Sequence, residues 1–561
     1  MPRTTLGLGL GSLVLVALAS SALARLPLDA RTVTVQLLAI NDFHGNLEPP
    51  DGANGLINRV PAGGAEYLAT HLANAVAEQP NSIIVAAGDV IGASPLVSSL
   101  FHDEPTVAAM NAMHLAVTSV GNHEFDKGQP ELLRLARGGC HPVDGCQAGA
   151  TFPGARFEYL SANVVRTGTK APLFRATAVR RVGGVKIGFI GETLQDTPRI
   201  VSPAGTRGLT FLDEATMANA QARALARQGV HAIVLLIHEG GRQSADDAAA
   251  DPNGCADFKG AIVPIVQRLT PEIRVVISGH THRFYNCEIA GHVVTSAASY
   301  GRMITRVSLD IDSATDRVVH AKALNEVVTR DVAKDPEQTR LLARYEPLAK
   351  SAGDRSVGTI SADIVRDANA AGESPLGDVI ADAQLAATRG PEAGGAVVAF
   401  MNGGGIRADL AARRAGQAAA PSELTYRDLF AVQPFGNVVT VITLTGDQIK
   451  QVLEQQFDNP RPGERSMLQV SNGFTYEYRN TGPAGQHVDA SSIVIQGRRL
   501  EPSDRVRVAA PDFVIDSGLY PALRAGAERK AGVIDIDALV AYVKTHSPLV
   551  PGPQDRIRRL D

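Results

Sequence analysis

The stretch Gly121-Asn122-His123-Glu124-Phe125-Asp126 follows an apolar, β-branched run and brings an amide, an imidazole and two carboxylates close together. Four further segments place side chains of the same kinds after β-like runs. They are Asn41-Asp42-Phe43-His44-Gly45, Gly88-Asp89, His238-Glu239-Gly240 and Gly279-His280-Thr281-His282. Together they offer the ligands that two metal ions sharing one carboxylate require, with one imidazole left as a proton donor. The sequence therefore predicts a two-metal hydrolase.

The same segments indicate the fold, because each follows an expected strand. Residues 33–328 alternate β-like runs with helical patterns, which predicts an α/β layer structure. The expected strands are 33–40, 82–87, 117–120, 185–190, 232–237 and 275–277, and the expected helices are 65–77, 106–113, 215–228 and 261–269. Segments 293–295 and 304–311 are expected to close a second sheet. Sites in open α/β sheets form beyond the carboxyl ends of strands, so the ligand segments should meet at one edge.

A chain of 561 residues is too long for one hydrophobic core, so two domains are expected. The charged stretch 329–354 is predicted to link them through a solvated helix at 338–348, with a hinge near 352–355. Residues 355–548 are predicted to form the second domain. Its expected helices are 376–388 and 446–457, and its expected strands are 396–400, 438–444, 474–478, 492–495 and 505–510. Ala- and Gly-rich stretches at 390–395 and 411–420 are interpreted as loops or a helix end.

Residues 1–24 are predicted to be a signal peptide. Arg3 gives a positive start, residues 6–18 are apolar, and Ala22-Leu23-Ala24 fits a cleavage site. A membrane anchor is the alternative, but the apolar stretch is shorter than the roughly 20 residues that a span needs. No Cys lies at the cleavage point, and the end of the chain is polar. We therefore expect an exported protein, periplasmic or secreted, without a stable membrane anchor.

The four cysteines all lie in the first half of the chain, and an even number in an exported protein favours disulfides. The expected pairs are Cys140 with Cys146 and Cys255 with Cys287, although four cysteines allow three connectivities. A cysteine metal site is the weaker alternative, because no CxxC spacing occurs.

The near-neutral composition argues against a nucleic-acid partner. The net charge is −4, and no basic stripe suggests a long nucleic-acid groove. A small-molecule nucleotide or phosphate ester is the expected partner, and the oligomeric state is not predicted. Histidines without ligand spacing are interpreted as structural, with a pocket role for His102 as the weaker alternative; they are His71, His102, His114 and His231.

The motifs Asp42-x-His44, Gly88-Asp89, Gly121-Asn122-His123-Glu124 and Gly279-His280-x-His282 resemble the calcineurin-like metallophosphoesterase pattern. Residues beyond them resemble the 5′-nucleotidase family, which includes bacterial UDP-sugar hydrolases and 2′,3′-cyclic-nucleotide phosphodiesterases. The resemblance covers nearly the whole mature chain. It implies an N-terminal four-layer α/β/β/α sandwich and a smaller C-terminal α/β substrate-binding domain.

The resemblance also implies roles for the metal-type residues. One ion would be held by Asp42, His44, Asp89 and His282, and the other by Asp89, Asn122, His238 and His280. His123 would protonate the leaving oxygen or stabilise phosphoryl charge, and Asp126 would orient its imidazole. Oxygen and imidazole ligands without thiolate suit two divalent ions such as Mn, Zn, Co, Fe or Mg.

The second domain carries the expected substrate contacts. Asn402-Gly403-Gly404-Gly405-Ile406-Arg407 lets backbone approach a ligand closely and offers a planar cation for phosphate oxygens. In the family this Arg contacts the substrate and Asn402 the base, and Phe435 and Phe513 match the aromatics that sandwich it. The stretch Asp516–Tyr520 departs from the family loop that holds the ribose. The family also often has an Arg shortly before the motif that begins at Glu373, but Ala370-Ala371-Gly372 occupies that stretch here, and Arg366 lies too far upstream to be assigned as the second phosphate clamp.

These observations predict an exported dinuclear-metal phosphohydrolase that removes the 5′-phosphate of nucleotides to give a nucleoside and inorganic phosphate. A 2′,3′-cyclic-nucleotide phosphodiesterase or a UDP-sugar pyrophosphatase on the same scaffold is the nearest alternative, because substrate choice lies in the second domain. An extracellular protein that binds nucleotides or metals without catalysis is the alternative of another class. The pair His123 and Asp126 argues against it, because a binder needs no leaving-group acid.

Overall fold

The computed structural model describes residues 32–50, 52–146, 149, 151–244, 250–412, 421–459 and 463–561. The predicted signal peptide and residues 413–420 of the predicted loop lie outside the described residues. Within the described part of the chain, none of the helices combines the length and apolar character that crossing a membrane requires.

The first of two large sheets has six strands in the order β16-β15-β1-β4-β5-β6. The four strands from β1 to β6 run parallel, and β15 and β16 are antiparallel additions. The bounds are β1 (Thr32–Ile40), β4 (Ser82–Ala87), β5 (Leu115–Ser119), β6 (Glu158–Leu160), β15 (Met303–Asp312) and β16 (Arg317–Val327). The expectation that 304–311 closes a second sheet is wrong, because β15 pairs with β1 over most of its length.

The second sheet also has six strands, in the order β13-β14-β12-β11-β9-β8. Its four inner strands are parallel, and the two edge strands are antiparallel. The bounds are β8 (Thr177–Val182), β9 (Val185–Thr193), β11 (Ala232–His238), β12 (Ile273–Ser278), β13 (Phe284–Ile289) and β14 (His292–Ala297). The expectation for 293–295 is confirmed, because β14 belongs to this sheet.

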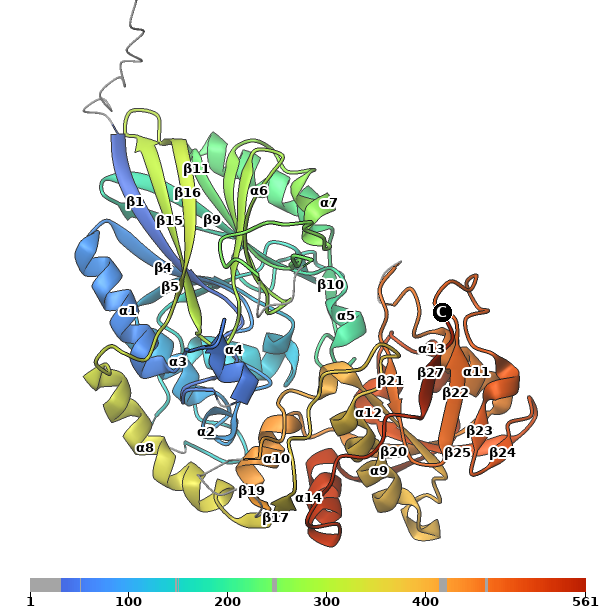
Figure 1. Cartoon of the computed structure of the whole chain (residues 1–561). Coiled ribbons are helices and arrows are strands. Elements are labelled where there is room, and N and C mark those ends of the chain that lie inside the picture. Colours follow the sequence, from blue (N-terminus) through green and yellow to red (C-terminus); the bar gives the residue numbers. More distant parts are fainter. Residues whose placement is uncertain are drawn as a thin grey trace, which may run out of the picture.

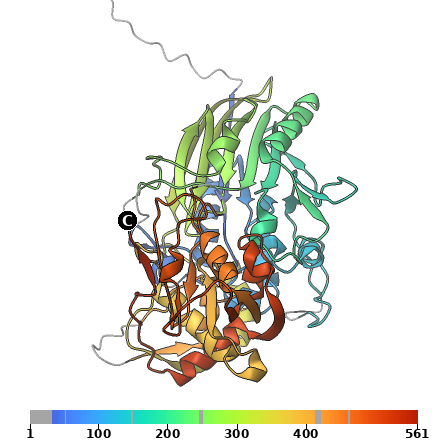
Figure 2. The same ribbon diagram turned by 90° about the vertical axis from the view of Figure 1, so that its right-hand side faces the viewer.

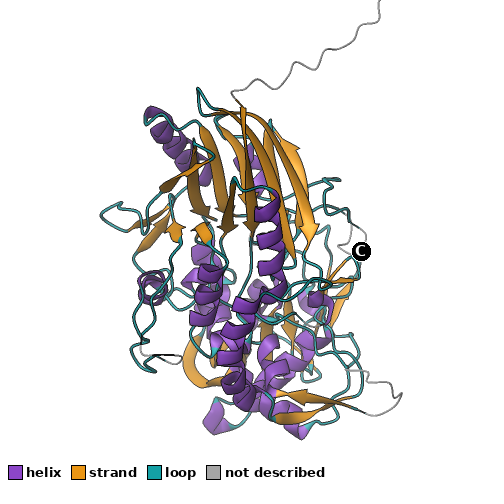
Figure 3. Cartoon of the chain, turned by 90° about the vertical axis from the view of Figure 1, so that its left-hand side faces the viewer, coloured by secondary structure: helices purple, strands orange, loops and turns teal. Residues whose placement is uncertain are grey.

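The two sheets pack face to face, and the alternation of side chains along β1 shows how. Leu37 and Ala39 lie in the core between the sheets with Phe189 and Leu236 of the second sheet. Leu38 lies instead in the core beneath the outer helices. The helices that cover the first sheet are α1 (Ala65–Glu78), α3 (Glu104–Ala112) and α4 (Gln129–Arg137), and those on the second are α6 (Glu214–Arg227) and α7 (Ile262–Val266). The predicted α/β/β/α sandwich is confirmed (Figures 1 and 3).

The C-terminal domain is built on a five-stranded sheet in the order β21-β18-β25-β20-β26. Its strands are β18 (Val398–Asn402), β20 (Val438–Thr445), β21 (Leu468–Val470), β25 (Arg505–Pro511) and β26 (Ala527–Ile534). Leu385 and Ala538 on one face belong to α9 (Pro375–Thr388) and α14 (Asp535–Thr545). Leu453 of α11 (Gly446–Glu454) packs on the other face with Phe474. The second α/β domain is therefore confirmed.

A small four-stranded sheet extends this domain to the end of the described chain. It has the order β24-β23-β22-β27, and its strands are β22 (Phe474–Tyr478), β23 (Val494–Ile495), β24 (Arg498–Arg499) and β27 (Ile557–Arg559). Because β27 pairs in parallel with β22, the domain continues beyond residue 548, where the sequence prediction ended it. The buried Ile557 side chain belongs to the same core as Phe474.

Short elements complete the two domains. They are β2 (Leu56–Ile57), β3 (Val60–Pro61), α2 (Leu96–Ser99), β7 (Val164–Arg166), α5 (Thr197–Ile200), β10 (Leu209–Phe211), β17 (Ser356–Ile360), β19 (Ser422–Thr425), α10 (Tyr426–Val432), α12 (Asp512–Asp516) and α13 (Pro521–Arg524).

The linker is the helix α8 (Pro336–Gly353), which starts where the Asp335 side chain accepts the N–H groups of Glu337 and Gln338. It is only half solvated, because Leu342 and Tyr345 are buried against the N-terminal domain. The expectation of a solvated helix is wrong for that face. The helix runs along the N-terminal domain and ends beside the C-terminal one (Figure 1). In the turned view the C-terminal domain, gold to red, lies in front of the lower part of the N-terminal domain (Figure 2). The hinge near 352–355 stays a prediction.

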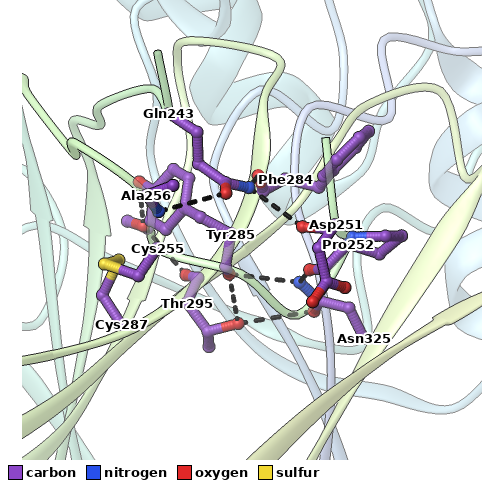
Figure 4. The surroundings of a disulfide bond; sticks show 11 residues. Gln243, Asp251, Pro252, Cys255, Ala256, Phe284, Tyr285, Cys287, Thr295 and Asn325 are labelled. Atoms are coloured by element: carbon purple, nitrogen blue, oxygen red, sulfur yellow. Dashed lines mark hydrogen bonds between the residues drawn. A yellow bond between two sulfur atoms is a disulfide. The ribbon is translucent and has the colours of Figure 1, made fainter. Parts of the chain in front are cut away.

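Both expected disulfides are present, Cys140–Cys146 and Cys255–Cys287. The second ties a loop to β13, and neighbouring hydrogen bonds strengthen the attachment (Figure 4). Asn325 of β16 donates to the carbonyl oxygens of Pro252 and Tyr285 at 2.8 and 3.1 Å. Since β13 follows the loop that carries His280 and His282, these bonds fix one side of the predicted metal site.

Candidate dinuclear metal centre

The predicted metal ligands come together where strands of both large sheets end. Asp42, Asp89 and His238 follow or close β1, β4 and β11, and Asn122 follows β5. The structure brings together all seven predicted ligands: Asp42, His44, Asp89, Asn122, His238, His280 and His282. This is the edge that the α/β architecture predicts for a binding site.

Asp89 lies at the middle of the group. Its Oδ2 atom is 2.9 Å from His238 Nε2 and 3.6 Å from His44 Nε2. On one side, His282 Nε2 is 3.0 Å from His44 Nε2 and 3.4 Å from Asp42 Oδ1. On the other side, His280 Nδ1 lies 3.0 Å from Asn122 Oδ1. Donor atoms thus gather on two sides of one carboxylate.

Backbone groups hold the imidazoles in position. His44 Nδ1 lies 2.8 Å from the carbonyl oxygen of Gly92, and His238 Nδ1 lies 2.8 Å from that of Ala87. Each contact occupies the Nδ1 atom and leaves the Nε2 atom to bind a metal, as is usual for metal-binding histidines.

The loops that carry the ligands are conformationally strained. Non-glycine residues seldom have positive φ, and clusters of them occur at functional sites. Five of the predicted ligands have φ between 47° and 71°: Asp42, His44, Asp89, His280 and His282. The surrounding sheet ends therefore impose conformations that these residues do not prefer.

A buried carboxylate ties two ligand loops together. Glu124 Oε2 accepts the N–H groups of Asp89 and Gly121 at 2.9 and 2.6 Å, and its Oε1 accepts that of Val90 at 2.9 Å. Glu124 is 2% exposed, so water does not compete for these bonds. Its part in the motif could not be predicted from the residue type, because two of its partners, the N–H groups of Asp89 and Val90, belong to another strand end.

The donor set fits divalent metal ions. It combines four imidazoles, two carboxylates and one amide, which suits borderline and hard cations. The buried His238 Nε2 atom lies 2.9 Å from Asp89 Oδ2. Burying such polar groups is costly unless they bind a metal or pair with charge. Asp42, His44 and Asp89 are at most 1% exposed, so this cost applies to them.

Burial also sets the protonation of the imidazoles. It lowers the pKa of His280 to about 3 and the pKa of His44 and His282 well below the usual range. These imidazoles are neutral, which is the form that binds a metal. Burial alone would lower the pKa of His238 too, but Asp89 and Asp42 outweigh it and raise that pKa. His238 must therefore lose a proton when its imidazole binds a metal.

His123 and Asp126 lie beside the metal ligands. His123 Nδ1 is 2.8 Å from Asp126 Oδ2, and the His123 backbone N–H donates to Asp89 Oδ1 at 2.8 Å. Burial would lower the pKa of His123, but Asp126 and Asp89 outweigh it and raise that pKa. The imidazole is thus held, oriented and biased toward its protonated form.

A cavity of about 710 Å³ opens from this centre into the C-terminal domain. The predicted residues in its wall come from both domains: Asn122, His123, Asp126, His280, Asn402, Arg407, Phe435 and Phe513. Phe435 stacks on His123 with a centroid separation of 5.7 Å, and the Lys127 ammonium donates to the Phe435 carbonyl oxygen at 3.3 Å. The two domains therefore face one another directly across the site.

Arg407 points a cation into this cavity. Its Nε and Nη2 atoms are buried and have no hydrogen-bond partner among the described residues. Arg366 and Asn54 bind the Arg407 carbonyl oxygen at 2.7 and 3.2 Å, so Arg366 supports Arg407 from behind. Asp516 pairs with Arg529 instead of lining the cavity.

Comparison with known proteins agrees with this geometry. Residues 35–284 match the model of the calcineurin-like phosphoesterases, and residues 356–524 match that of the 5′-nucleotidase C-terminal domain. The chain belongs to the 5′-nucleotidase family. These matches agree with the predicted enzyme class, a metal-dependent phosphoester hydrolase, and calcineurin-like phosphoesterases use a dinuclear metal centre.

Individual relatives of this 5′-nucleotidase family member carry different names. Endonuclease YhcR of Bacillus subtilis is 32% identical over 94% of the chain, which spans 41% of YhcR. Cell wall protein Lmo0130 of Listeria monocytogenes is 32% identical over 87% of the chain, which spans 64% of Lmo0130. The chain thus covers less than two thirds of either relative. The solved 5′-nucleotidase precursor from Thermus thermophilus is 25% identical, with a TM-score of 0.76 over 94% of this chain and all of that one.

Replacing Gly121 by Ala tests the geometry without removing any ligand. A Cβ atom at Gly121 would overlap Asp89 Oδ1 and crowd the Asp89 backbone N at 2.6 Å. We expect Gly121→Ala to weaken metal binding by about 10–100-fold, the range for loss of ligand support. Metal titration followed by mass spectrometry of bound metal measures this. Gly390→Ala is the matched control, because nothing lies within 4 Å of its Cβ position. Equal metal affinity in the two variants would contradict the assigned centre.

Proposed function

We propose that the protein is an exported phosphohydrolase that uses two divalent metal ions to remove the 5′-phosphate of nucleotides. The products are a nucleoside and inorganic phosphate. The observation that carries this proposal is the guanidinium of Arg407, buried with unpartnered N–H groups in the cavity shared with His123. A guanidinium with two buried, open N–H donors favours an anionic ligand, and its planar fork matches phosphate oxygens.

The metal ligands divide into two sets around Asp89. We assign one ion to Asp42, His44, Asp89 and His282, and the other to Asp89, Asn122, His238 and His280. When bound, the two ions supply Lewis acidity and lower the pKa of a bound water. This set of oxygen and imidazole donors suits Mn, Zn, Co, Fe or Mg.

Side chains of the protein bind the phosphate and protonate the leaving oxygen. Arg407 neutralises phosphate oxygens and orients them from the side of the C-terminal domain. His123 faces the same cavity and donates a proton to the leaving oxygen. Asp126 holds the His123 imidazole at 2.8 Å and favours its charged form.

The base contacts come from aromatic side chains. Phe435 and Phe513 both line the cavity, and Asn402 lies in its wall at the end of β18. Aromatic faces hold any nucleobase by stacking, so this wall favours a nucleotide over a simple phosphate ester. The relative solved from Thermus thermophilus is described as a 5′-nucleotidase precursor, which agrees with a monophosphate substrate.

Export is supported by two features. The predicted signal peptide precedes Thr32, the first described residue, and the N-terminal domain contains two disulfides. Disulfides persist in oxidising compartments such as the periplasm and the extracellular medium.

Phosphate release from a substrate panel tests the function. Purified protein with Mn²⁺ would receive AMP, UMP, UDP-glucose, 2′,3′-cyclic AMP, a short DNA oligonucleotide and an aryl phosphate. We expect fastest turnover of the monophosphates, and a fall of about 10²–10⁴-fold in kcat in His123→Ala. Exclusive turnover of diesters, of UDP-glucose or of the oligonucleotide would overturn the monophosphate assignment. Nucleotide binding without turnover would support a non-catalytic binder.

The pH profile tests the pairing of His123 with Asp126. If imidazolium is the proton donor, activity persists below the pKa of His123 and falls as pH rises through it. Asp126 raises that pKa, so Asp126→Asn should lower it and move the alkaline limb of kcat to lower pH. Turnover of AMP measured across pH 5–10 provides the comparison. An alkaline limb at the same pH in both proteins would exclude His123 as the donor.

A further inference from the structure

A second group of metal-type side chains lies in the wall of the same cavity, away from the dinuclear centre. His102, Glu131 and His141 each offer a donor atom, and the three atoms lie within 4.8 Å of one another. All three residues line the cavity. We propose that they bind a third divalent cation of the zinc type.

The imidazoles are prepared for this role by Asp144. Its Oδ2 atom is 2.8 Å from His102 Nε2 and 3.3 Å from His141 Nδ1. The Asp144 carboxylate thus lies against one nitrogen of each ring, and the Asp144 backbone N–H also donates to His141 Nδ1 at 3.2 Å. We assign the second nitrogen of each ring to the metal. Metal-binding histidines characteristically use one nitrogen for the metal and the other for such a carboxylate. Asp144 and His102 also line a neighbouring cleft.

The two rings are stacked closely. Their centroids are 3.7 Å apart and their planes meet at 12°. This stacking holds the two imidazoles side by side in the cavity wall.

Glu131 completes the donor set and is held rigidly. Arg134 binds both of its carboxylate oxygens at 2.8 and 2.7 Å, and the same guanidinium pairs with Glu104 at 2.6 Å. Each carboxylate oxygen keeps a further lone pair for a metal.

The chain around His141 is also constrained. His141 lies in a short hairpin closed by the Cys140–Cys146 disulfide, and its backbone carbonyl accepts the N–H of Gly145 at 2.9 Å. Glu131 lies on α4 and His102 follows α2, so a shared cation would join three separate elements. We infer that this cation fixes the outer wall of the substrate cavity.

Metal stoichiometry tests the proposal without relying on the substrate or on catalysis. The full-length mature chain would be loaded with Zn²⁺, freed of excess metal by gel filtration and measured by mass spectrometry. We expect three equivalents in the wild type, two in His102→Ala and two in His141→Ala. His320→Ala is the matched control, because it removes an exposed imidazole from β16, and it should keep three.

Zinc titration adds a second measure. Asp144→Asn keeps the three proposed ligands, and we expect it to weaken only the third equivalent, by about 10–100-fold. Retention of two equivalents in each variant shows that the dinuclear centre and the fold are intact. Two equivalents in the wild type, or three with unchanged affinity in both histidine variants, would overturn the proposal.

Discussion

The hydrogen bonds from backbone N–H groups to Glu124 are the constraint on which the site depends. This carboxylate joins the loop after β4 to the loop after β5 and sits beneath Asp89. Both loops are fixed to one buried group, so Asp89 and Asn122 keep a fixed relative position although they follow different strands. The parallel sheet places the two loops at one edge, and the hydrogen bonds to Glu124 fix their positions relative to one another.

The second constraint is the contact between domains. The chemistry proposed for the centre belongs to the N-terminal domain, but Arg407 and Phe435 of the C-terminal domain line the same cavity. The salt bridge of Arg427 to Glu48, at 2.6 Å, and the bonds from Arg366 and Asn54 to Arg407 support that arrangement. The residues proposed to select the substrate and those proposed to bind metal thus lie far apart in the sequence but close together around one cavity.

Much of the fold could be predicted because its strands are nearly continuous apolar runs. The strand expected at 232–237 is β11 with one further residue, His238. The assignment of β15 to the first sheet could not be predicted, because pairing with β1 joins residues far apart in sequence. The same holds for β27, whose three residues carry no recognisable strand pattern.

The residues of the candidate site were predictable where a motif supplied the pattern. All seven predicted ligands lie together, and Asn402, Arg407, Phe435 and Phe513 line one cavity with His123. Their individual roles stay predictions. Glu124 as a brace, Arg366 as a support of Arg407 and His141 in the cavity wall were missed, because each depends on a tertiary contact that no local spacing reveals.

The most direct test of the central claim is anomalous diffraction from crystals grown with Mn²⁺ and a non-hydrolysable nucleoside phosphonate. We predict two manganese peaks at the dinuclear centre, both in contact with Asp89, with Arg407 bound to a phosphonate oxygen and the base beside Phe435. A single peak at this centre, or two peaks that do not share Asp89, would contradict the account. A nucleotide analogue bound away from Arg407 would contradict the shared role of the two domains.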